Sequence, residues 1–361
     1  MADAPPTAAA APTVQARVEG RAGVIVMDRP RALNALDRPM IAAIHAALRR
    51  FADDPAVSLV LLEGAGGRAF CAGGDVRAIR DAALAGDAAA TEAFFSEEYA
   101  LNAAIAAFQK PWVSLIDGVC MGGGIGVSVH GSHRVATEHA LMAMPETAIA
   151  LFPDVGTSHV LPRLPGAVGT WLALTGHRLR GAACVEAGLA THFVPRESLP
   201  ALRAALVETG DAGAVDAHAR PVPPGEVAAA REAVDRAYAG GTVPNVLRAL
   251  EAEGTDWSRE QVATLRRMSP TSLCVTRELL RRGAALDLAG CLAMELALTR
   301  VVTRHPDFAE GVRAVLVDKD GAPRWAPATV ESVDEAAIRA MFDAAAPATA
   351  AGPGETPTPA G

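Results

Sequence analysis

Aromatic side chains are scarce in this 361-residue chain, since Phe, Trp and Tyr together make up 4% of it. Uninterrupted apolar runs of about 18 residues, which a membrane-spanning helix needs, are absent from the sequence. Half of the residues are hydrophobic, but many of these are alanine, which favours helices and the close packing of helices on sheets. The composition therefore predicts a soluble, globular protein with no membrane partner.

An excess of positive charge is also missing. The formal net charge is −8, whereas a sequence-independent nucleic-acid binder needs a dense cationic surface. Basic residues gather only in small groups such as Arg29, Arg31 and Arg77, which suffice for the phosphates of a small ligand. We therefore expect no nucleic-acid partner.

Cysteine is rare and shows no pattern. The five cysteines are odd in number and widely spaced, with no Cys-x-x-Cys pair and no Cys–His metal spacing, which fits a reducing compartment. Cys71 and Cys120 have small or apolar neighbours and no histidine close in sequence, so a structural role is favoured over a catalytic thiol. His130 and His133 flank a glycine without a set of carboxylates, so we expect no metal site.

The two ends of the chain are low in complexity. Residues 1–16 and 345–361 are dominated by small residues and proline, which predicts disordered tails. Met1 to Val14 contains neither the basic start of a secretory signal nor the arginines of a mitochondrial transit peptide. The cytoplasm is therefore the expected compartment.

Between the tails, strand and helix patterns alternate. Apolar runs at Val24–Met27, Leu59–Leu62 and Trp112–Ile116 indicate strands, and apolar positions at helical spacing follow Asp37, a plausible N-cap. This alternation predicts an α/β fold with a parallel-rich sheet in residues 17–200. From about residue 198 the pattern is almost wholly helical, so residues 201–344 are expected to form an appended helical region.

Two glycine-bearing segments carry the chemistry, Phe70–Asp75 and Gly118–Gly124, and each follows an apolar strand. Two strand-to-helix turns with exposed N–H groups can direct both donors at one carbonyl oxygen, which is the geometry of an oxyanion hole for a thioester. The glycines at 122, 124 and 126 lack the spacing of a dinucleotide fingerprint. Tight packing is the alternative explanation for both segments.

Two carboxylates follow the second segment. Glu146 and Asp154 can supply a base or a nucleophile. Each also has a simpler explanation, because Glu146 suits the first turn of a helix and Asp154 suits a turn or a helix cap.

These segments resemble the two signature segments of the enoyl-CoA hydratase/isomerase (crotonase) superfamily. Further segments resemble its 3-hydroxyisobutyryl-CoA hydrolase branch, and the similarity covers roughly Val24 to Pro327, apart from about residues 205–255. Those segments are Glu97–Asn102, Ser128–Gly131, Arg134–Glu138, Met144–Thr147, Leu151–Gly156, Leu172–Gly176, Ser269–Leu273 and Asp307–Ala314. The resemblance implies a ββα spiral core followed by a helical C-terminal region.

The resemblance also implies roles for individual residues. The backbone N–H groups of Gly74 and Gly123 would form the oxyanion hole. The region of Ala72 and Gly73 would receive the CoA moiety, and Arg31 matches a basic position near the CoA phosphates. Glu98 resembles a position that binds the substrate hydroxyl. No cofactor is implied, because CoA is part of the substrate, and the family often forms trimers or hexamers.

One departure from the hydratase pattern favours hydrolysis. Hydratases carry a glutamate three residues after the second oxyanion glycine, where this chain has Gly126. Glu146 stands at their other catalytic position, and Asp154 supplies a different second carboxylate, which is the hydrolase arrangement. Glu146 would attack the thioester or activate water, and Asp154 would position the water or the substrate. The implied reaction converts 3-hydroxyisobutyryl-CoA and water into 3-hydroxyisobutyrate and CoA, a step of valine catabolism.

Two other functions stay open on the sequence. An enoyl-CoA hydratase or isomerase could use Glu146 alone, and a non-catalytic acyl-CoA-binding protein could keep the fold without turnover. The substrate is open as well, because Thr157–His159 and Glu295–Leu298 depart from the hydrolase pattern. A related thioester such as 3-hydroxypropionyl-CoA is therefore a possible substrate.

Overall fold

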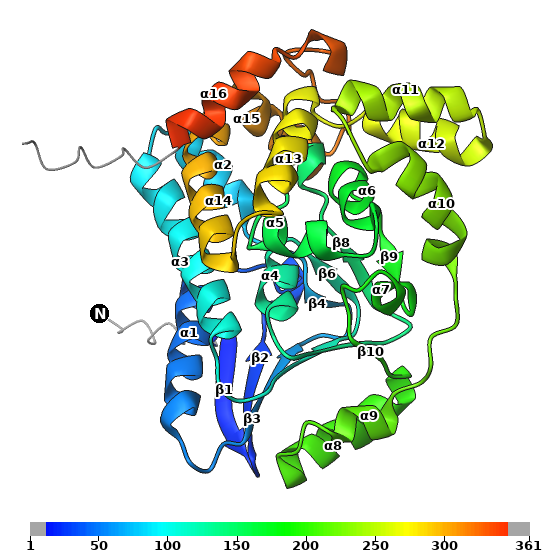
Figure 1. Ribbon diagram of the computed structural model, residues 1–361. Helices are drawn as coiled ribbons and strands as arrows, with labels where there is room; N and C mark the ends of the chain where they lie inside the picture. Colours follow the sequence, from blue (N-terminus) through cyan, green and yellow to red (C-terminus); the bar gives the residue numbers. More distant parts are fainter. Residues whose placement is uncertain (1–11, 346–361) are drawn as a thin grey trace, which may run out of the picture.

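Two β-sheets form the centre of the structure, a computed structural model that describes residues 12–345 (Figure 1). The larger sheet contains, in spatial order, β1 (Val14–Glu19), β2 (Ala22–Met27), β3 (Leu59–Gly64), β5 (Trp112–Ile116), β7 (His133–Ala136) and β10 (His192–Phe193). The smaller contains β4 (Ala69–Cys71), β6 (Val119–Met121), β8 (Leu141–Ala143) and β9 (Leu179–Arg180). Only β1–β2 and β8–β9 pair antiparallel, so the predicted parallel-rich sheet is confirmed.

The chain visits the two sheets in turn. β3, β5 and β7 lie in the larger sheet, and the strand that follows each of them, β4, β6 or β8, lies in the smaller one. A helical segment leads back after each pair of strands, which makes each repeat a ββα turn of a spiral. The expected α/β fold with a ββα spiral core is thus present.

Helices cover this core on several sides. They are α1 (Arg38–Asp53), α2 (Val76–Leu84), α3 (Ala88–Ala106), α4 (Gly123–Val129), α5 (Thr157–Val160), α6 (Val168–Thr175), α7 (Ala183–Glu186), α8 (Leu199–Thr209), α9 (Ala214–His218), α10 (Glu226–Tyr238), α11 (Val243–Glu253), α12 (Asp256–Leu265), α13 (Pro270–Gly283), α14 (Leu288–Val302), α15 (Pro306–Val312) and α16 (Glu335–Ala345). At the start of α1 the Asp37 carboxylate accepts a 2.9 Å hydrogen bond from the Met40 N–H, which confirms the predicted N-cap.

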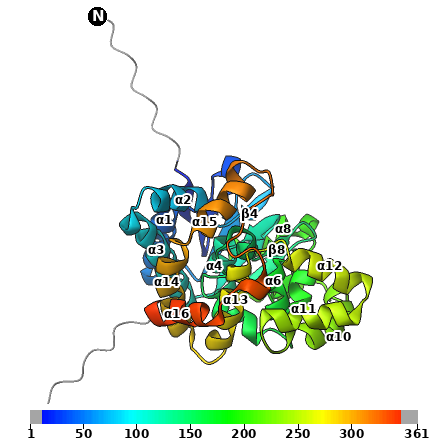
Figure 2. The ribbon, with the colours of Figure 1, turned by 90° about the horizontal axis from the view of Figure 1, so that it is seen from above.

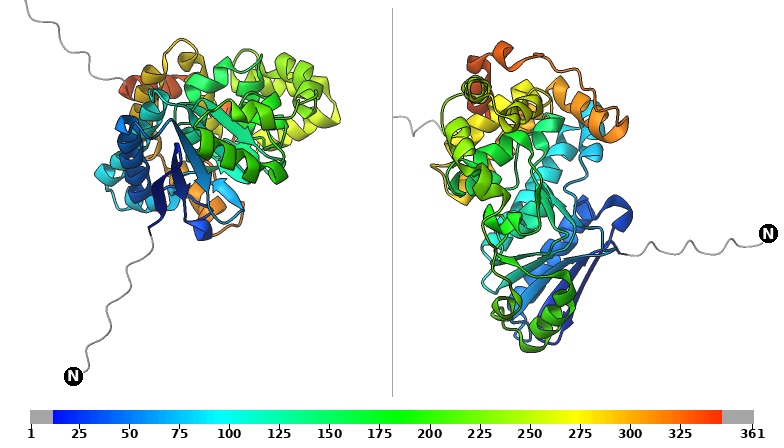
Figure 3. Two further views of the ribbon diagram at one scale, coloured as in Figure 1. Left: turned by 90° about the horizontal axis from the view of Figure 1, so that it is seen from below. Right: turned by 90° about the vertical axis from the view of Figure 1, so that its right-hand side faces the viewer.

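The region beyond residue 200 is helical, and its first helices pack on the larger sheet. Leu202 and Leu206 of α8 are fully buried against apolar side chains of the larger sheet, including Val24 of β2. Figure 3 shows α8 and α9 (green) beside the blue strands of that sheet. Helices α8 and α9 therefore cover one face of the core, and the division expected at residue 200 stays a prediction.

The remaining C-terminal helices take two directions. Seen from above, α10, α11 and α12 project to one side, whereas α13, α14 and α16 lie over the core (Figure 2). Helix α14 packs along α3, and α16 packs on α14. Elements about 200 residues apart in sequence therefore meet above the spiral, next to the ends of the strands.

The predicted tails need correction where they meet described residues. Val14 to Ala16 belong to β1, because alternate side chains of this strand are partly buried while its backbone pairs with β2. Ala345 is the last residue of α16. The rest of both predicted tails lies outside the described residues. Within residues 12–345, no helix is long and apolar enough to cross a membrane.

Candidate active site

Three parallel strands end side by side, and each leads directly into a turn with a predicted site residue. β4 leads to Gly74, β6 leads to Gly123, and β8 leads to Glu146. β6 pairs with β4 on one side and with β8 on the other, both in parallel. Because the carboxyl ends of neighbouring parallel strands meet at one edge, the spiral brings these three residues together.

The two amide groups predicted to form an oxyanion hole lie close to each other. A Cβ atom added to Gly123 would lie 3.2 Å from the Gly74 nitrogen, and one added to Gly73 would lie 3.8 Å from the Gly123 nitrogen. The N–H of Leu36 donates to Gly73 and the N–H of Asp75 donates to Leu36, which fixes the backbone on both sides of Gly74. Within residues 12–345, the N–H groups of Gly74 and Gly123 have no protein acceptor. Both donors are therefore available to a ligand oxygen.

Glycine is required at this point for two reasons. Gly73 has φ +114° and Gly122 has φ +47°, conformations that side-chain-bearing residues rarely adopt. A Cβ at Gly123 would also lie only 2.3 Å from the Glu98 carboxylate, and one at Gly122 would lie 2.8 Å from the Glu146 carboxylate. The glycines therefore let two carboxylates approach the backbone of the turn.

Glu98 and Glu146 are buried acids that have no ion pair with Lys or Arg within residues 12–345. Glu98 on α3 is 2% exposed, and Glu146, the first residue of the short 3₁₀ helix η2 (Glu146–Ile149), is 6% exposed. One carboxylate oxygen of each has no hydrogen-bond partner within the described residues. Burial, followed by the charge of Asp154, raises the pKa of both carboxyl groups well above the ordinary value. Both groups therefore hold a proton more readily than an exposed glutamate does.

Asp154 lies in the same cluster. It is 5% exposed, and it accepts a 2.7 Å hydrogen bond from the Tyr99 hydroxyl. Burial raises the pKa of Asp154 to about 6, although the Tyr99 hydrogen bond favours the charged form. The charge of Asp154 helps to raise the pKa of Glu98 and of Glu146, so the titrations of the three carboxyl groups are linked.

Gly126 occupies the position at which hydratases carry their other glutamate. A Cβ atom on Gly126 would lie 2.6 Å from the Val155 Cβ and 3.0 Å from the Asn102 side-chain nitrogen. The segment that carries Asp154 therefore packs directly against this glycine. A glutamate side chain at position 126 has no room in this arrangement.

Ala72 and Arg31 lie at the outer side of the first turn. The Ala72 N–H donates a 3.0 Å hydrogen bond to Leu33, next to the short helix η1 (Pro30–Ala32). Arg31 is exposed on η1 and Ala72 is half-buried. Arg29, by contrast, forms an ion pair with Asp75 at 3.1 Å. Arg31 is thus the member of this arginine pair that faces solvent near the glycine turn.

The cysteines and the two histidines show no sign of a reactive role. Burial raises the pKa of Cys71 to about 12, which disfavours a thiolate. The ring of His130 makes a 2.7 Å hydrogen bond with the Val155 carbonyl, and His133 stacks on His192. No group of three potential metal ligands occurs within residues 12–345.

The sequence reasoning gave no role in the reaction to two residues that contact the site, Tyr99 and Glu295. Tyr99 directly follows Glu98 and is one of only two tyrosines in the chain, which is a signal that could have been used. Glu295 on α14 is fully buried and bonds to Gly156 and Ser158. No local signal identifies it, since these contacts span 137 to 139 residues.

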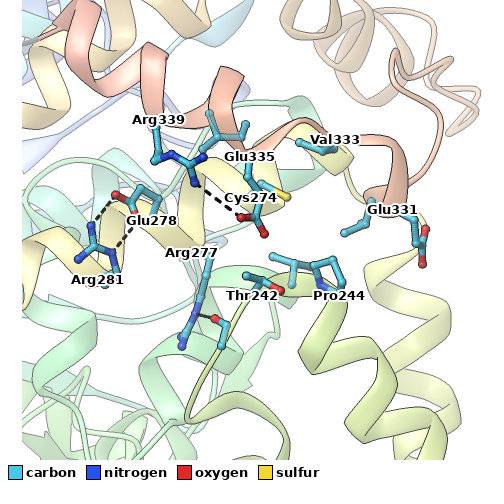
Figure 4. A pocket seen from close by; sticks show the side chains of 14 residues that line it. Thr242, Pro244, Cys274, Arg277, Glu278, Arg281, Glu331, Val333, Glu335 and Arg339 are labelled. Carbon is cyan, nitrogen blue, oxygen red and sulfur yellow. Dashed lines mark hydrogen bonds and ion pairs between the residues drawn. The ribbon is translucent and has the colours of Figure 1, made fainter.

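A separate cavity of about 470 Å³ lies under α16 and does not belong to this cluster (Figure 4). Residues of α11, α13 and α16 line it, none of them a predicted site residue. Two of its acids are paired with arginines, Glu278 with Arg281 and Glu335 with Arg339. We therefore assign the candidate active site to the strand ends rather than to this cavity.

Two backbone amides facing a cluster of buried carboxylates, on a two-sheet ββα spiral, define a protein of the crotonase class. The model of the family described as enoyl-CoA hydratase/isomerase matches residues 22–342. The chain belongs to this family.

Curated relatives narrow the comparison. The chain is 46% identical over 334 residues to the mitochondrial 3-hydroxyisobutyryl-CoA hydrolase of Xenopus laevis, covering 90% of this chain and 86% of the relative. It is 43% identical over 344 residues to the human protein of the same name, covering 92% and 89%. The resemblance to the hydrolase branch is thereby confirmed.

Solved structures with similar folds carry other names. A carnitinyl-CoA dehydratase from Mycobacterium thermoresistibile matches with a TM-score of 0.88 and 39% identity, covering 93% of this chain and 97% of the other. An enoyl-CoA hydratase from Rhodobacter sphaeroides matches with a TM-score of 0.85 and 40% identity, covering 91% and 97%. Both comparisons extend over the helical C-terminal region as well as the spiral.

These comparisons contradict the expected cytoplasmic location. Both curated relatives described above are named as mitochondrial proteins. The expectation depended on the composition of the first 14 residues, which does not settle the compartment.

Proposed function

We propose that this protein hydrolyses the thioester of a short β-hydroxyacyl-CoA, with 3-hydroxyisobutyryl-CoA as the substrate. The products are 3-hydroxyisobutyrate and CoA, which fits a step of valine degradation. Support comes from relatives of that name with 43–46% identity over most of the chain. CoA enters as part of the substrate, and no cofactor takes part in the proposal.

The observation that carries the proposal is the choice of carboxylates. Glu146 is buried against the oxyanion turn and Asp154 is buried in the same group of carboxyls, whereas Gly126 is closed off by Val155. Hydration of a double bond uses two glutamates to manage one water and one α-proton. With position 126 unable to supply the second, the remaining pair suits attack on a carbonyl carbon.

The oxyanion hole would lower the barrier electrostatically. The thioester oxygen would accept hydrogen bonds from the N–H groups of Gly74 and Gly123, and these bonds strengthen as the oxygen becomes negative. Each donor of this kind contributes about 3 kcal/mol to transition-state stabilisation. Because the turn is fixed before the substrate binds, the protein does not have to reorganise during the reaction.

Glu146 would act on the carbonyl carbon in one of two ways. As a nucleophile it forms a mixed anhydride as the C–S bond breaks and CoA leaves with a proton, and water then cleaves the anhydride. As a general base it removes a proton from water, whose oxygen attacks the carbonyl carbon; the C–S bond then breaks, and Glu146 returns the proton to the leaving CoA thiolate. Either way one water is consumed, and Asp154 would orient that water or the substrate.

The ends of the substrate would be held by separate groups. Glu98 has a buried carboxylate oxygen without a partner, which suits the β-hydroxyl group. Ala72 and Gly73 would accommodate the CoA moiety along the first turn, and the exposed Arg31 would meet its phosphates. We also expect a homo-oligomer, a trimer or a hexamer, which light scattering on the purified protein would test.

A panel of thioesters tests the proposal. Release of the free CoA thiol would be followed with (S)-3-hydroxyisobutyryl-CoA, 3-hydroxypropionyl-CoA and isobutyryl-CoA, which lacks the hydroxyl. We expect kcat/KM for isobutyryl-CoA to be lower by about 100-fold or more, because the buried Glu98 would be left unpaired. Equal rates with and without the hydroxyl would contradict the proposed substrate class.

Hydration is the second candidate function. The solved structures named as a carnitinyl-CoA dehydratase and an enoyl-CoA hydratase favour it, at 39% and 40% identity. The packing of Gly126 against Val155 argues against it. Addition of water to crotonyl-CoA, read by loss of its ultraviolet absorbance, separates the two functions on the same preparation.

A further inference from the structure

The turn that follows Asp154 is strained. Val155 has φ +53° and Gly156 has φ +80°, so two consecutive residues adopt left-handed conformations. For a β-branched residue such as Val155 this conformation is an outlier that costs conformational energy. A conformation of this kind persists only where the surrounding contacts fix it.

Glu295 supplies the largest set of these contacts. Its Oε2 accepts a 2.7 Å hydrogen bond from the Gly156 N–H. Its Oε1 accepts hydrogen bonds from the Ser158 N–H, at 3.1 Å, and from the Ser158 hydroxyl. The carboxylate therefore closes the turn from both sides of Thr157, and His130 holds the Val155 carbonyl from a third direction.

The carboxylate itself is in an unfavourable place. Glu295 is fully buried on α14, and within residues 12–345 it has no ion pair with Lys or Arg. A buried carboxylate is costly unless several donors satisfy it, and here three donors from the turn do so. Because this buried acid bonds directly to the turn that carries Asp154, its position points to a role in the site.

We propose that Glu295 is a positioning residue for the reaction and acts through Asp154. By holding Gly156 and Ser158, it fixes the strained turn and thereby the direction in which the Asp154 carboxylate points. The Tyr99 hydroxyl also restrains the Asp154 carboxylate, because it donates a hydrogen bond to it. The inference rests on the proposed thioesterase function for its kinetic test, but the tether itself is testable without a substrate.

The kinetic test is a double-mutant cycle. Glu295→Gln removes the second acceptor oxygen, and we expect kcat to fall by about 10–100-fold with KM changed less than about threefold, the effect of a small misplacement. In an Asp154→Asn background the same substitution is expected to change kcat by less than about twofold. The matched control is Glu232→Gln on α10. The Glu232 side chain is almost fully exposed, so this variant should leave kcat unchanged.

If Glu295 had only a structural role, the double-mutant cycle with Asp154 would give a different result. Glu295→Gln would then lower kcat by the same factor with and without the Asp154 carboxylate, and that outcome, like an unchanged kcat in the single variant, overturns the inference. Glu295→Asp retains both acceptor oxygens and should recover part of the lost kcat. If Glu295→Gln does not fold, Ser158→Ala loosens the same tether while leaving both N–H donors in place, and the cycle is run with it.

The substrate-free test is hydrogen exchange. We expect the amides of Gly156 and Ser158 to exchange at least about tenfold faster in Glu295→Gln than in the unmodified chain, because their acceptor is weakened. Unchanged exchange there would overturn the inference even if the protein is a thioesterase. Conversely, faster exchange together with no thiol release from any thioester would overturn the proposed function and leave the tether intact.

Discussion

Two regions of the molecule gather acidic side chains in opposite surroundings. At the ends of the smaller sheet's strands, four acids are buried with no Lys or Arg partner within residues 12–345: Glu98, Glu146, Asp154 and Glu295. In the cavity under α16, Glu278 pairs with Arg281 at 2.7 Å, and Glu335 pairs with Arg339 at 3.6 Å (Figure 4).

The two surroundings shift the pKa of Glu278 and the pKa of Glu295 in opposite directions. The hydrogen bond from Arg281 is the main cause that lowers the pKa of Glu278. Burial instead raises the pKa of Glu295 to about 8, and the charge of Asp154 contributes to the rise. Paired acids support the fold, whereas buried acids without a cation destabilise it and are expected where chemistry requires them. The contrast favours the strand ends over the cavity as the proposed reactive region.

The largest effect is expected for Glu146→Gln. Loss of the attacking or proton-accepting carboxylate should lower kcat for thiol release by about 1,000-fold. The side chain is isosteric, so CoA binding measured by calorimetry should stay within about threefold. The control is the same change in the paired region, Glu278→Gln, which should leave kcat unchanged and lower the unfolding free energy by up to about 1 kcal/mol. Comparable losses of kcat in both variants would contradict the proposed difference between the strand ends and the cavity.

The oxyanion turn gives the next largest effect. In Gly123→Ala the new Cβ would lie 2.3 Å from the Glu98 carboxylate and 3.2 Å from the Gly74 nitrogen, so the turn must shift. We expect kcat to fall by about 100-fold or more, since a displaced donor no longer meets the oxyanion. Gly240→Ala is the control, because no atom lies within 4 Å of its added Cβ. Normal turnover in Gly123→Ala would contradict the assigned oxyanion hole.

Asp154→Asn is expected to lower activity but to raise the unfolding free energy, relative to the unmodified chain, as the pH rises. The pKa of Asp154 is about 6 in the folded chain and 3.8 ordinarily, so its protonated form contributes stability that is present below pH 4 and lost as the pH rises through 6. Asparagine does not titrate, so relative to the unmodified chain the variant should gain about 2 kcal/mol of unfolding free energy between pH 4 and pH 8. Urea unfolding of both proteins at pH 4 and pH 8 measures this gain. An equal difference in unfolding free energy at the two pH values would contradict the raised pKa of Asp154.

The same shift predicts how activity depends on pH. If the charged form of Asp154 is needed, kcat/KM should fall as the pH drops below about 6, which is a higher pH than for an exposed aspartate. In Asp154→Asn this part of the profile should disappear along with most of the activity. An acid limb near pH 4 in the unmodified chain would show that Asp154 is not buried as described.

The smallest effect is expected for Arg31→Ala. Arg31 is exposed, so removal of its contact with the CoA phosphates should raise KM by about threefold to tenfold with little change in kcat. A thioester of N-acetylcysteamine lacks those phosphates and should show no difference between the variant and the unmodified chain. A KM that rises equally with both substrates would argue against a phosphate contact.

The sequence predicts the part of the site that depends on local order. Gly74, Gly123 and Glu146 each follow a strand directly, and parallel pairing of β4, β6 and β8 is enough to bring them together. Glu295 could not be predicted, because its contact with Ser158 joins residues 137 positions apart through the packing of α14. The fold shows the same limit, since the position of α8 on the larger sheet is fixed by buried Leu202 and Leu206 rather than by any local pattern.

The most direct test of the central claim is a paired assay on one preparation of the unmodified chain. Thiol release from (S)-3-hydroxyisobutyryl-CoA and hydration of crotonyl-CoA would be measured side by side at pH 8. The account predicts rapid thiol release with hydration lower by about 100-fold or more, because Gly126 leaves the hydratase pair incomplete. Hydration without thiol release would contradict it and would mean that Glu146 works without Asp154.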